Sequence, residues 1–292
     1  MLYTVKNDKL SLTVSDMGAE MQSLLACDGT EFLWQGDPAY WTGHAYIMFP
    51  ICGRLTDGKY TYKGREYSMN LHGFARKTQY ELYARSDDML AFRLTQSEKS
   101  LECYPFEFEL IITYRLKGSS VSIEYTVRNP GSKELIFSVG GHPGFNVPFA
   151  KDGTEFTDYY LEFDKPADVR SIVMSPTCYT TREEHPFIME NGVRLALKHE
   201  LFDNDAIVLD DPCRAVSIKN GKNDRFVRVE YPDMSYLGLW HAPHTEAPYV
   251  CIEPWSSVPA YDGEVDDLDT KRSMTKLAPG GEYRNTLNIS VK

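Results

Sequence analysis

Two titratable side chains in this sequence have neighbours that suggest a chemical role, and the first is His142. It lies in the stretch Phe137-Ser-Val-Gly-Gly-His-Pro-Gly-Phe-Asn-Val-Pro148. Glycine adopts backbone conformations closed to other residues and proline lacks a backbone donor, so the pattern predicts an imidazole held where a strand is interrupted. Histidine titrates near neutral pH and can therefore transfer protons. The alternative is a structural histidine in a tight turn.

The second is Glu253, in the stretch Val250-Cys-Ile-Glu-Pro-Trp-Ser256. It ends an alternating apolar strand and is followed by Pro254 and Trp255. A carboxylate among apolar and aromatic side chains is costly unless it is paired or bound, so its pKa should be perturbed and the residue is a candidate general base. The alternative is a glutamate at a strand end that reaches solvent.

Two further stretches place basic side chains beside glycine. Arg54 ends the stretch Phe49-Pro-Ile-Cys-Gly-Arg54. It is a candidate for contacting a ligand, and the alternative is a surface salt bridge. His72 and Arg76 lie in Leu71-His-Gly-Phe-Ala-Arg76, where the alternative is a buried histidine satisfied by the backbone. Each of these signals is weak when it is considered alone.

Acidic and aromatic residues complete the set of candidates. Asp203 and Asp205 precede the apolar run Ala206–Leu209, a position where aspartates commonly belong to turns. Four other side chains are candidates for shaping a cleft without assigned contacts: Trp240, Trp255, His241 and His244.

The bulk composition excludes several classes of partner. The net charge is -11, with 31 basic against 42 acidic residues, whereas nucleic acids and acidic membranes are bound by clustered Lys and Arg. The N-terminus lacks the pattern of a signal peptide and no segment is apolar enough to span a bilayer, so we expect a soluble cytoplasmic protein. The six cysteines are scattered singly without C-x-x-C, which predicts reduced thiols and gives no zinc-site spacing.

Strands with a period of two must position these residues. Apolar side chains alternate over Phe108–Leu116 and Val121–Val127, which predicts a hairpin with its turn at Lys117–Ser120. The turn at Asn129–Ser132 then leads into the stretch that ends at His142, so we expect a three-stranded meander that delivers the histidine.

Similar alternating runs occur on both sides of this meander: 23–34, 60–67, 226–231, 236–240 and 249–253. Helical periodicity is weak, and only residues 37–41 suggest a turn of helix. The chain shows no linker, charge block or repeat. The sequence therefore predicts an all-β fold, a large antiparallel β-sandwich formed by residues 1–292 as a single domain.

Four motifs, in this order, resemble the galactose mutarotase-like (aldose 1-epimerase) family: GR at 53–54, LHGF at 71–74, GGHPGFNVP at 140–148 and IEPW at 252–255. The HGFAR form, the compact length and the NDA run are most similar to the LacX-type branch. The resemblance covers nearly the whole chain. It implies a large antiparallel β-sandwich that binds a sugar in an open cleft across one sheet.

The resemblance also implies roles for individual residues. Glu253 matches the general base of the family and His142 its general acid, while His72 and Arg54 match sugar-binding positions. For the remaining acidic ligand we favour Asp205, which directly precedes the apolar run, and Asp203 is the fallback.

The chemistry needs one base and one acid. An aldopyranose changes anomer by ring opening, in which the C1 hydroxyl loses a proton and the ring oxygen gains one; rotation about C1–C2 and reclosure follow. Each positioned group typically contributes on the order of 10² to 10⁴ in rate. No metal, nucleotide or redox cofactor is required, and none of their motifs is present. The expected partner is a small-molecule sugar, and the oligomeric state stays open.

Alternatives share the scaffold but differ in substrate or in chemistry. Arg76, four residues after His72, could join Arg54 in binding a phosphate, which would make the protein a hexose 6-phosphate mutarotase. A non-catalytic sugar-binding or sensing protein would be expected to lack the acid or the base. A β-sandwich glycosidase or lyase would ordinarily need a second catalytic carboxylate, and the sequence does not point to a clear one.

Overall fold

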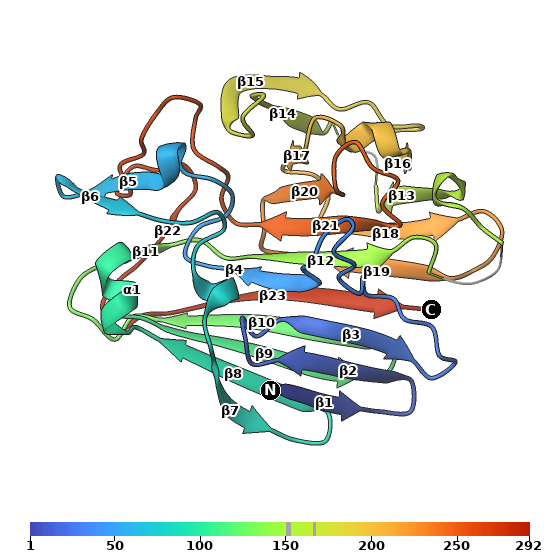
Figure 1. Cartoon of the computed structure of the whole chain (residues 1–292), viewed down its shortest axis with the longest axis horizontal. Coiled ribbons are helices and arrows are strands. Elements are labelled where there is room, and N and C mark those ends of the chain that lie inside the picture. The colour runs from blue at the N-terminus through green and yellow to red at the C-terminus, as the bar shows by residue number, and fades with distance from the viewer. Residues whose placement is uncertain (150–152, 166–167) are drawn as a thin grey trace.

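The computed structural model describes residues 1–149, 153–165 and 168–292, and antiparallel strands dominate these ranges (Figure 1). One sheet has nine described strands, in the order β16 (Arg194–Ala196), β13 (Tyr159–Phe163), β18 (Ala215–Asn220), β19 (Phe226–Glu230), β23 (Glu282–Val291), β10 (Ser120–Arg128), β9 (Glu109–Lys117), β8 (Met89–Thr95) and β7 (Glu81–Arg85). A second sheet has seven described strands, in the order β15 (Thr180–Pro186), β14 (Arg170–Met174), β17 (Ile207–Asp210), β20 (Tyr236–Trp240), β21 (Tyr249–Trp255), β12 (Gly140–Asn146) and β4 (Ala45–Met48).

Smaller elements surround these two sheets. The short sheets are β1 (Leu2–Lys6) with β2 (Leu10–Ser15) and β3 (Met21–Ala26), β5 (Lys59–Tyr62) with β6 (Arg65–Ser68), and β11 (Leu135–Phe137) with β22 (Thr275–Leu277). The helical elements are α1 (Glu98–Cys103) and the 3₁₀ turns η1 (Thr56–Gly58), η2 (Ala75–Lys77), η3 (Phe156–Asp158) and η4 (His199–Phe202). Figure 1 shows α1 and the β5–β6 hairpin at the opposite end of the molecule from β13 and β16. No helix in the described ranges is long and apolar enough to cross a membrane.

The predicted all-β antiparallel architecture is confirmed, but the predicted meander is wrong. β9 and β10 form the expected hairpin, with Leu116 opposite Val121. The other neighbour of β10 is β23, from the end of the chain, and not the segment that carries His142. That segment crosses over and becomes β12 of the seven-stranded sheet. It is buried along almost its whole length, as is typical of a strand inside a sheet and covered on both faces.

The expected interruption at His142 is found on only one side of the strand. Gly140–Asn146 is a continuous strand, and its ladder with β4 runs from Gly140 to Pro143 without a gap. The ladder with β21 is broken between Gly140 and Gly144. Because Pro143 has no backbone N–H, one ladder can lose its regular pairing while the strand itself continues.

The two large sheets pack against each other through alternate residues of their strands. Gly141 of β12 faces the nine-stranded sheet, and a Cβ atom at this position would lie 2.8 Å from Tyr125 Oη and 3.0 Å from a methyl carbon of Leu287. The absence of a side chain therefore allows close approach of the sheets. Since strand side chains alternate, His142 leaves the opposite face of the seven-stranded sheet, which we call the outer face. The main core fills the space between the sheets, and the outer face carries its own apolar clusters.

Candidate active site

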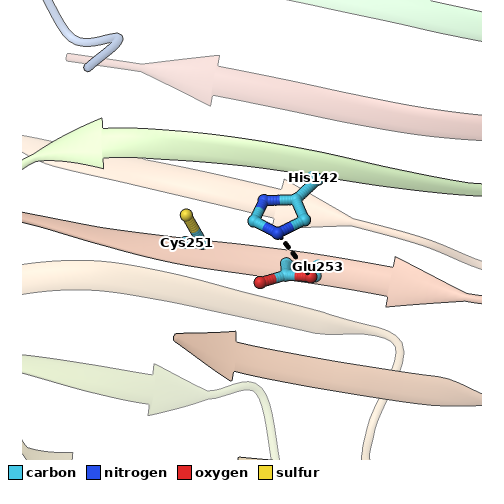
Figure 2. Close-up of side chains that lie close together, drawn as sticks. All are labelled: His142, Cys251 and Glu253. Atoms are coloured by element: carbon cyan, nitrogen blue, oxygen red, sulfur yellow. Dashed lines mark ion pairs between the residues drawn. The ribbon is translucent and has the colours of Figure 1, made fainter. Parts of the chain in front are cut away.

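His142 and Glu253 come from neighbouring strands of the seven-stranded sheet. β12 and β21 are antiparallel with Gly144 opposite Cys251, so the same register puts His142 opposite Glu253. Both side chains leave the outer face, and His142 Nε2 lies 3.2 Å from Glu253 Oε2 (Figure 2). The two residues are only 5% and 1% exposed. The fold thus places an imidazole and a carboxyl group in direct contact and almost out of reach of bulk water.

Burial controls the protonation of this pair, because removal from water disfavours the charged form of each group. Burial raises the pKa of Glu253 well above its ordinary value, and the negative charge of Asp205 adds to the effect. Burial also lowers the pKa of His142 to about 3, and the positive charge of Arg76 acts in the same direction. The favoured state is a protonated carboxyl beside an unprotonated imidazole. The pair therefore shares one proton, which this state places on Glu253.

Two polar atoms of the pair lack hydrogen bonds. His142 Nδ1 and Glu253 Oε2 are buried, and neither has a hydrogen-bond partner among the described residues. A buried polar atom without a partner has given up its hydrogen bond to water without compensation. A ligand that brings hydroxyl groups or a cation to this point would supply the missing interactions.

His72 reaches the same cavity from the loop between β6 and η2. Its backbone N–H donates to Gly53 O at 2.9 Å, and the Gly53 N–H donates to His72 Nδ1 at 3.0 Å. Burial lowers the pKa of His72 well below its ordinary value. The charge of a protonated His142 nearby is the next largest cause and acts in the same direction. A neutral ring that accepts at Nδ1 carries its proton on Nε2, which makes His72 a hydrogen-bond donor. Gly73 permits this turn, since it has φ +76° and a Cβ there would lie 2.1 Å from Phe49 O.

Asp205 lies on the cavity wall and Asp203 does not. Trp240 Nε1–H donates to Asp205 Oδ1 at 2.7 Å, and Arg54 Nη2 lies 3.8 Å from Asp205 Oδ2. Asp205 has φ +69°, an uncommon conformation for a residue with a side chain. Asp203 instead accepts the backbone N–H of His244 at 3.1 Å, outside the cavity. Of the two aspartates left open by the sequence, the structure brings only Asp205 together with the other candidates.

Arg76 is the second arginine of the cavity. Its guanidinium lies 4.7 Å from the ring centroid of Tyr46, and its Nε is buried without a hydrogen-bond partner among the described residues. The two ion pairs of the cavity join Arg54 with Asp205 and His142 with Glu253, and neither includes Arg76. Arg76 thus presents a positive charge to the cavity that no carboxylate of these two pairs neutralises.

The cavity has a volume of about 240 Å³. Besides the six predicted residues, its wall includes Trp41, Tyr46, Gly53, Leu71, Met174, Cys178, Ala206, Trp240, Trp255 and Pro259. Aromatic and apolar side chains with a few convergent polar groups are typical of small-molecule sites. All six predicted residues, Arg54, His72, Arg76, His142, Asp205 and Glu253, lie on this one cavity.

Sequence reasoning missed several residues of the wall. The ring centroids of Tyr46 and Trp41 lie 4.4 Å and 4.9 Å from that of His142. Tyr46 pairs with His142 across β4 and β12, and the continuous apolar run Ala45–Phe49 was the available signal. Cys178 has its pKa raised to about 11 by burial and by a hydrogen bond to Asp205, and nothing local in the sequence pointed to it.

The four cleft candidates divide into two groups. Trp240 and Trp255 line the cavity. His241 and His244 do not, since His241 lies against His199, with Nε2 3.1 Å from His199 Nδ1, and His244 contacts Asp203.

Comparisons with known proteins identify the family of the chain. The family model for aldose 1-epimerase matches residues 1–290. The plasmid-encoded protein LacX of Lactococcus lactis is 32% identical over 303 aligned positions, which cover 100% of this chain and 99% of LacX. A galactose mutarotase related enzyme from Lactobacillus acidophilus has a structure with TM-score 0.94 and 33% identity, covering 100% of this chain and 97% of that one. A galactose mutarotase-like protein from Lactobacillus casei gives TM-score 0.94 at 30% identity, with 100% of both chains covered. The chain therefore belongs to the aldose 1-epimerase family.

Proposed function

We propose that the protein is an aldose 1-epimerase that interconverts the α and β anomers of a free hexose. The observation that supports this most directly is the 3.2 Å contact between His142 Nε2 and Glu253 Oε2 on the wall of a small cavity. The anomeric hydroxyl and the ring oxygen of a pyranose are bonded to the same carbon, so two groups in contact with each other can reach both atoms. Family membership and the similarity to a galactose mutarotase related enzyme support the same reaction.

In this mechanism, Glu253 takes the proton of the C1 hydroxyl and His142 gives a proton to the ring oxygen. The bond between C1 and the ring oxygen breaks, and an open-chain aldehyde forms. This step converts a carboxylate and an imidazolium into a carboxylic acid and a neutral imidazole, the state that burial favours. Rotation about C1–C2 then exposes the other face of the aldehyde, and ring closure reverses both proton transfers. Because the neutral pair is the favoured resting state, a proton must first pass from Glu253 to His142, and ring opening then restores the neutral pair.

The remaining polar residues hold the sugar while the proton moves. We assign His72 Nε2–H as a donor to a sugar hydroxyl, because its Nδ1 is already occupied by Gly53. Asp205 would accept from hydroxyl groups and Arg54 would donate to them. The indole rings of Trp41 and Trp240 supply apolar surface for the faces of the ring.

The test is polarimetry of freshly dissolved α-D-glucose and α-D-galactose with the purified protein. The wild-type protein should shorten the approach to anomeric equilibrium beyond the buffer rate, and Glu253→Gln should lower the turnover rate by about 10² to 10⁴, since glutamine cannot accept the proton. Asp203→Asn is the matched control, because it neutralises a carboxylate that lies outside the cavity, and it should keep the wild-type rate. Full activity in a folded Glu253→Gln variant would refute the assignment of the base. No activity with any sugar, combined with sugar binding, would favour the non-catalytic alternative.

A second candidate function, mutarotation of a hexose 6-phosphate, is favoured by the unneutralised charge of Arg76. Hydrogen bonds to charged groups contribute about 1.5–3 kcal/mol, so Arg76→Gln should raise KM for glucose 6-phosphate by about tenfold or more and change KM for the free hexoses much less. Lys77→Gln removes the neighbouring exposed charge and is the matched control. Anomer-exchange NMR would measure both substrates. Acceleration of the free sugars alone would reject this candidate.

A further inference from the structure

The His142–Glu253 pair has a third neighbour, the thiol of Cys251. Cys251 precedes Glu253 by two residues in β21, so both side chains leave the outer face of the sheet. The potential ligand atoms of the three residues all lie within 4.8 Å of one another, and all three residues are buried. Figure 2 shows the thiol and the carboxyl group on one strand, with the imidazole reaching them from the neighbouring strand.

We propose that His142, Cys251 and Glu253 form a binding site for a thiophilic divalent cation such as Zn²⁺, and that the bound ion excludes the sugar. Imidazole nitrogen, thiolate sulfur and carboxylate oxygen are the three common zinc ligands in proteins. The binding step itself is independent of the reaction, whereas the inhibition rests on the proposed function.

The geometry fits such an ion after a small movement. Zinc lies about 2.0–2.2 Å from nitrogen and oxygen ligands and about 2.3 Å from sulfur, which puts tetrahedral ligand atoms about 3.3–3.6 Å apart. The 3.2 Å separation of His142 Nε2 and Glu253 Oε2 already matches one such edge. The sulfur of Cys251 lies within 4.8 Å of both, so it has to approach by at most about 1.2 Å to reach the longest of these ligand separations.

Hydrogen bonding and charge also favour a cation at this point. Glu253 Oε2 is buried without a hydrogen-bond partner among the described residues, so it is free to coordinate. A thiolate and a carboxylate together balance the two positive charges of the ion, and a site without net charge suits low-polarity surroundings. The thiol proton of Cys251 and the carboxyl proton of Glu253 both leave to solvent as the two groups coordinate the ion.

One feature of His142 points to reversible inhibition rather than to a resident metal. Metal-ligating histidines usually donate their second ring N–H to a carboxylate or a carbonyl, which fixes the ring and strengthens binding. His142 Nδ1 has no such partner among the described residues. Without that partner we expect the ion to bind reversibly. The sugar and the ion should then compete for His142 and Glu253.

The experiment measures metal binding and catalysis separately on the full-length protein. Isothermal titration with Zn²⁺ gives the affinity, and the ultraviolet sulfur-to-metal charge-transfer absorption on addition of Cd²⁺ reports thiolate coordination. Loss of a residue that hydrogen-bonds a metal ligand costs about 10- to 100-fold in metal affinity. Removal of the sulfur ligand itself in Cys251→Ser should therefore cost at least about 100-fold in zinc affinity and remove most of the Cd²⁺ absorption. Cys213→Ser is the matched control, since Cys213 is also buried but lies away from the cavity.

Circular dichroism and thermal melting check that each variant is folded. Galactose should weaken zinc binding to the wild-type protein, and Mg²⁺ should not bind. With each rate expressed as a fraction of the same variant's zinc-free rate, Cys251→Ser should need a higher zinc concentration for half inhibition than the wild type. Zinc affinity that is equal in wild type and Cys251→Ser, or no zinc binding at all, would overturn the proposal. Zinc binding that depends on Cys251 in a protein without mutarotase activity would instead reject the proposed function and leave the metal site in place.

Discussion

The hydrogen bond from Trp240 to Asp205 gives a quantitative test of how the cavity binds sugar. The bond measures 2.7 Å, and it holds an aspartate whose φ of +69° is otherwise unfavourable. Trp240→Phe removes the donor and reduces the indole to a single aromatic ring on the wall. A hydrogen bond to a charged group contributes about 1.5–3 kcal/mol, and we take the lower limit because the Asp205 side chain is 27% exposed to water. That energy corresponds to an increase in KM of about tenfold.

The assay is the initial rate of polarimetric change over a range of α-D-galactose concentrations, and kcat should change much less than KM. A double-mutant cycle with Asp205→Asn separates the bond from other effects of the tryptophan. If Trp240 acts through Asp205, the double variant should be little worse than Asp205→Asn alone. Independent, multiplicative losses, or an unchanged KM in Trp240→Phe, would refute the view that the indole positions the carboxylate.

Two further predictions test the binding histidine and the contact between the sheets. His72→Asn should raise KM for galactose with a smaller effect on kcat, because the proposed role of His72 is to donate to the sugar and not to move the reacting proton. A loss confined to kcat in the same polarimetric assay would exchange the roles of His72 and His142. Gly141→Ala should lower the free energy of unfolding by about 1–3 kcal/mol, since the added methyl group would lie 2.8 Å from Tyr125 Oη. Gly221→Ala, where no atom lies within 4 Å of the added Cβ, is the control, and equal urea midpoints for the two variants would contradict the packing argument.

Much of the architecture could be predicted because the period of two is a local property. The β9–β10 hairpin and the β5–β6 hairpin lie where the alternating runs and the turn residues put them. The partner of β10 could not be predicted in this way, since β23 comes from the far end of the chain and its pairing depends on the packing of both sheets. The prediction that the segment of β12 lies beside β10 was wrong for the same reason.

The site shows the same division between local and distant information. Glu253 could be singled out as a carboxylate among apolar residues, and its perturbed pKa follows from that setting. The sequence favoured Asp205 over Asp203 only because it directly precedes the apolar run. Its contacts with Trp240 and Arg54, which come from distant parts of the chain, could not be predicted. Cys251 escaped attention as a ligand because its two partners include a histidine far away in the sequence.

The six residues of the site have two different structural origins. His142 and Glu253 stand on adjacent strands inside a sheet, where the β4 ladder holds the backbone at His142 and the β20 ladder holds it at Glu253. Arg54, His72, Arg76 and Asp205 come from loops and short turns at the rim. Loops tolerate insertion and substitution far better than paired strands do. Exchange of the 70–77 segment between relatives should therefore alter which sugar is accepted while it leaves His142 and Glu253 in place. The fold thus allows substrate specificity to evolve while the residues proposed for proton transfer are preserved.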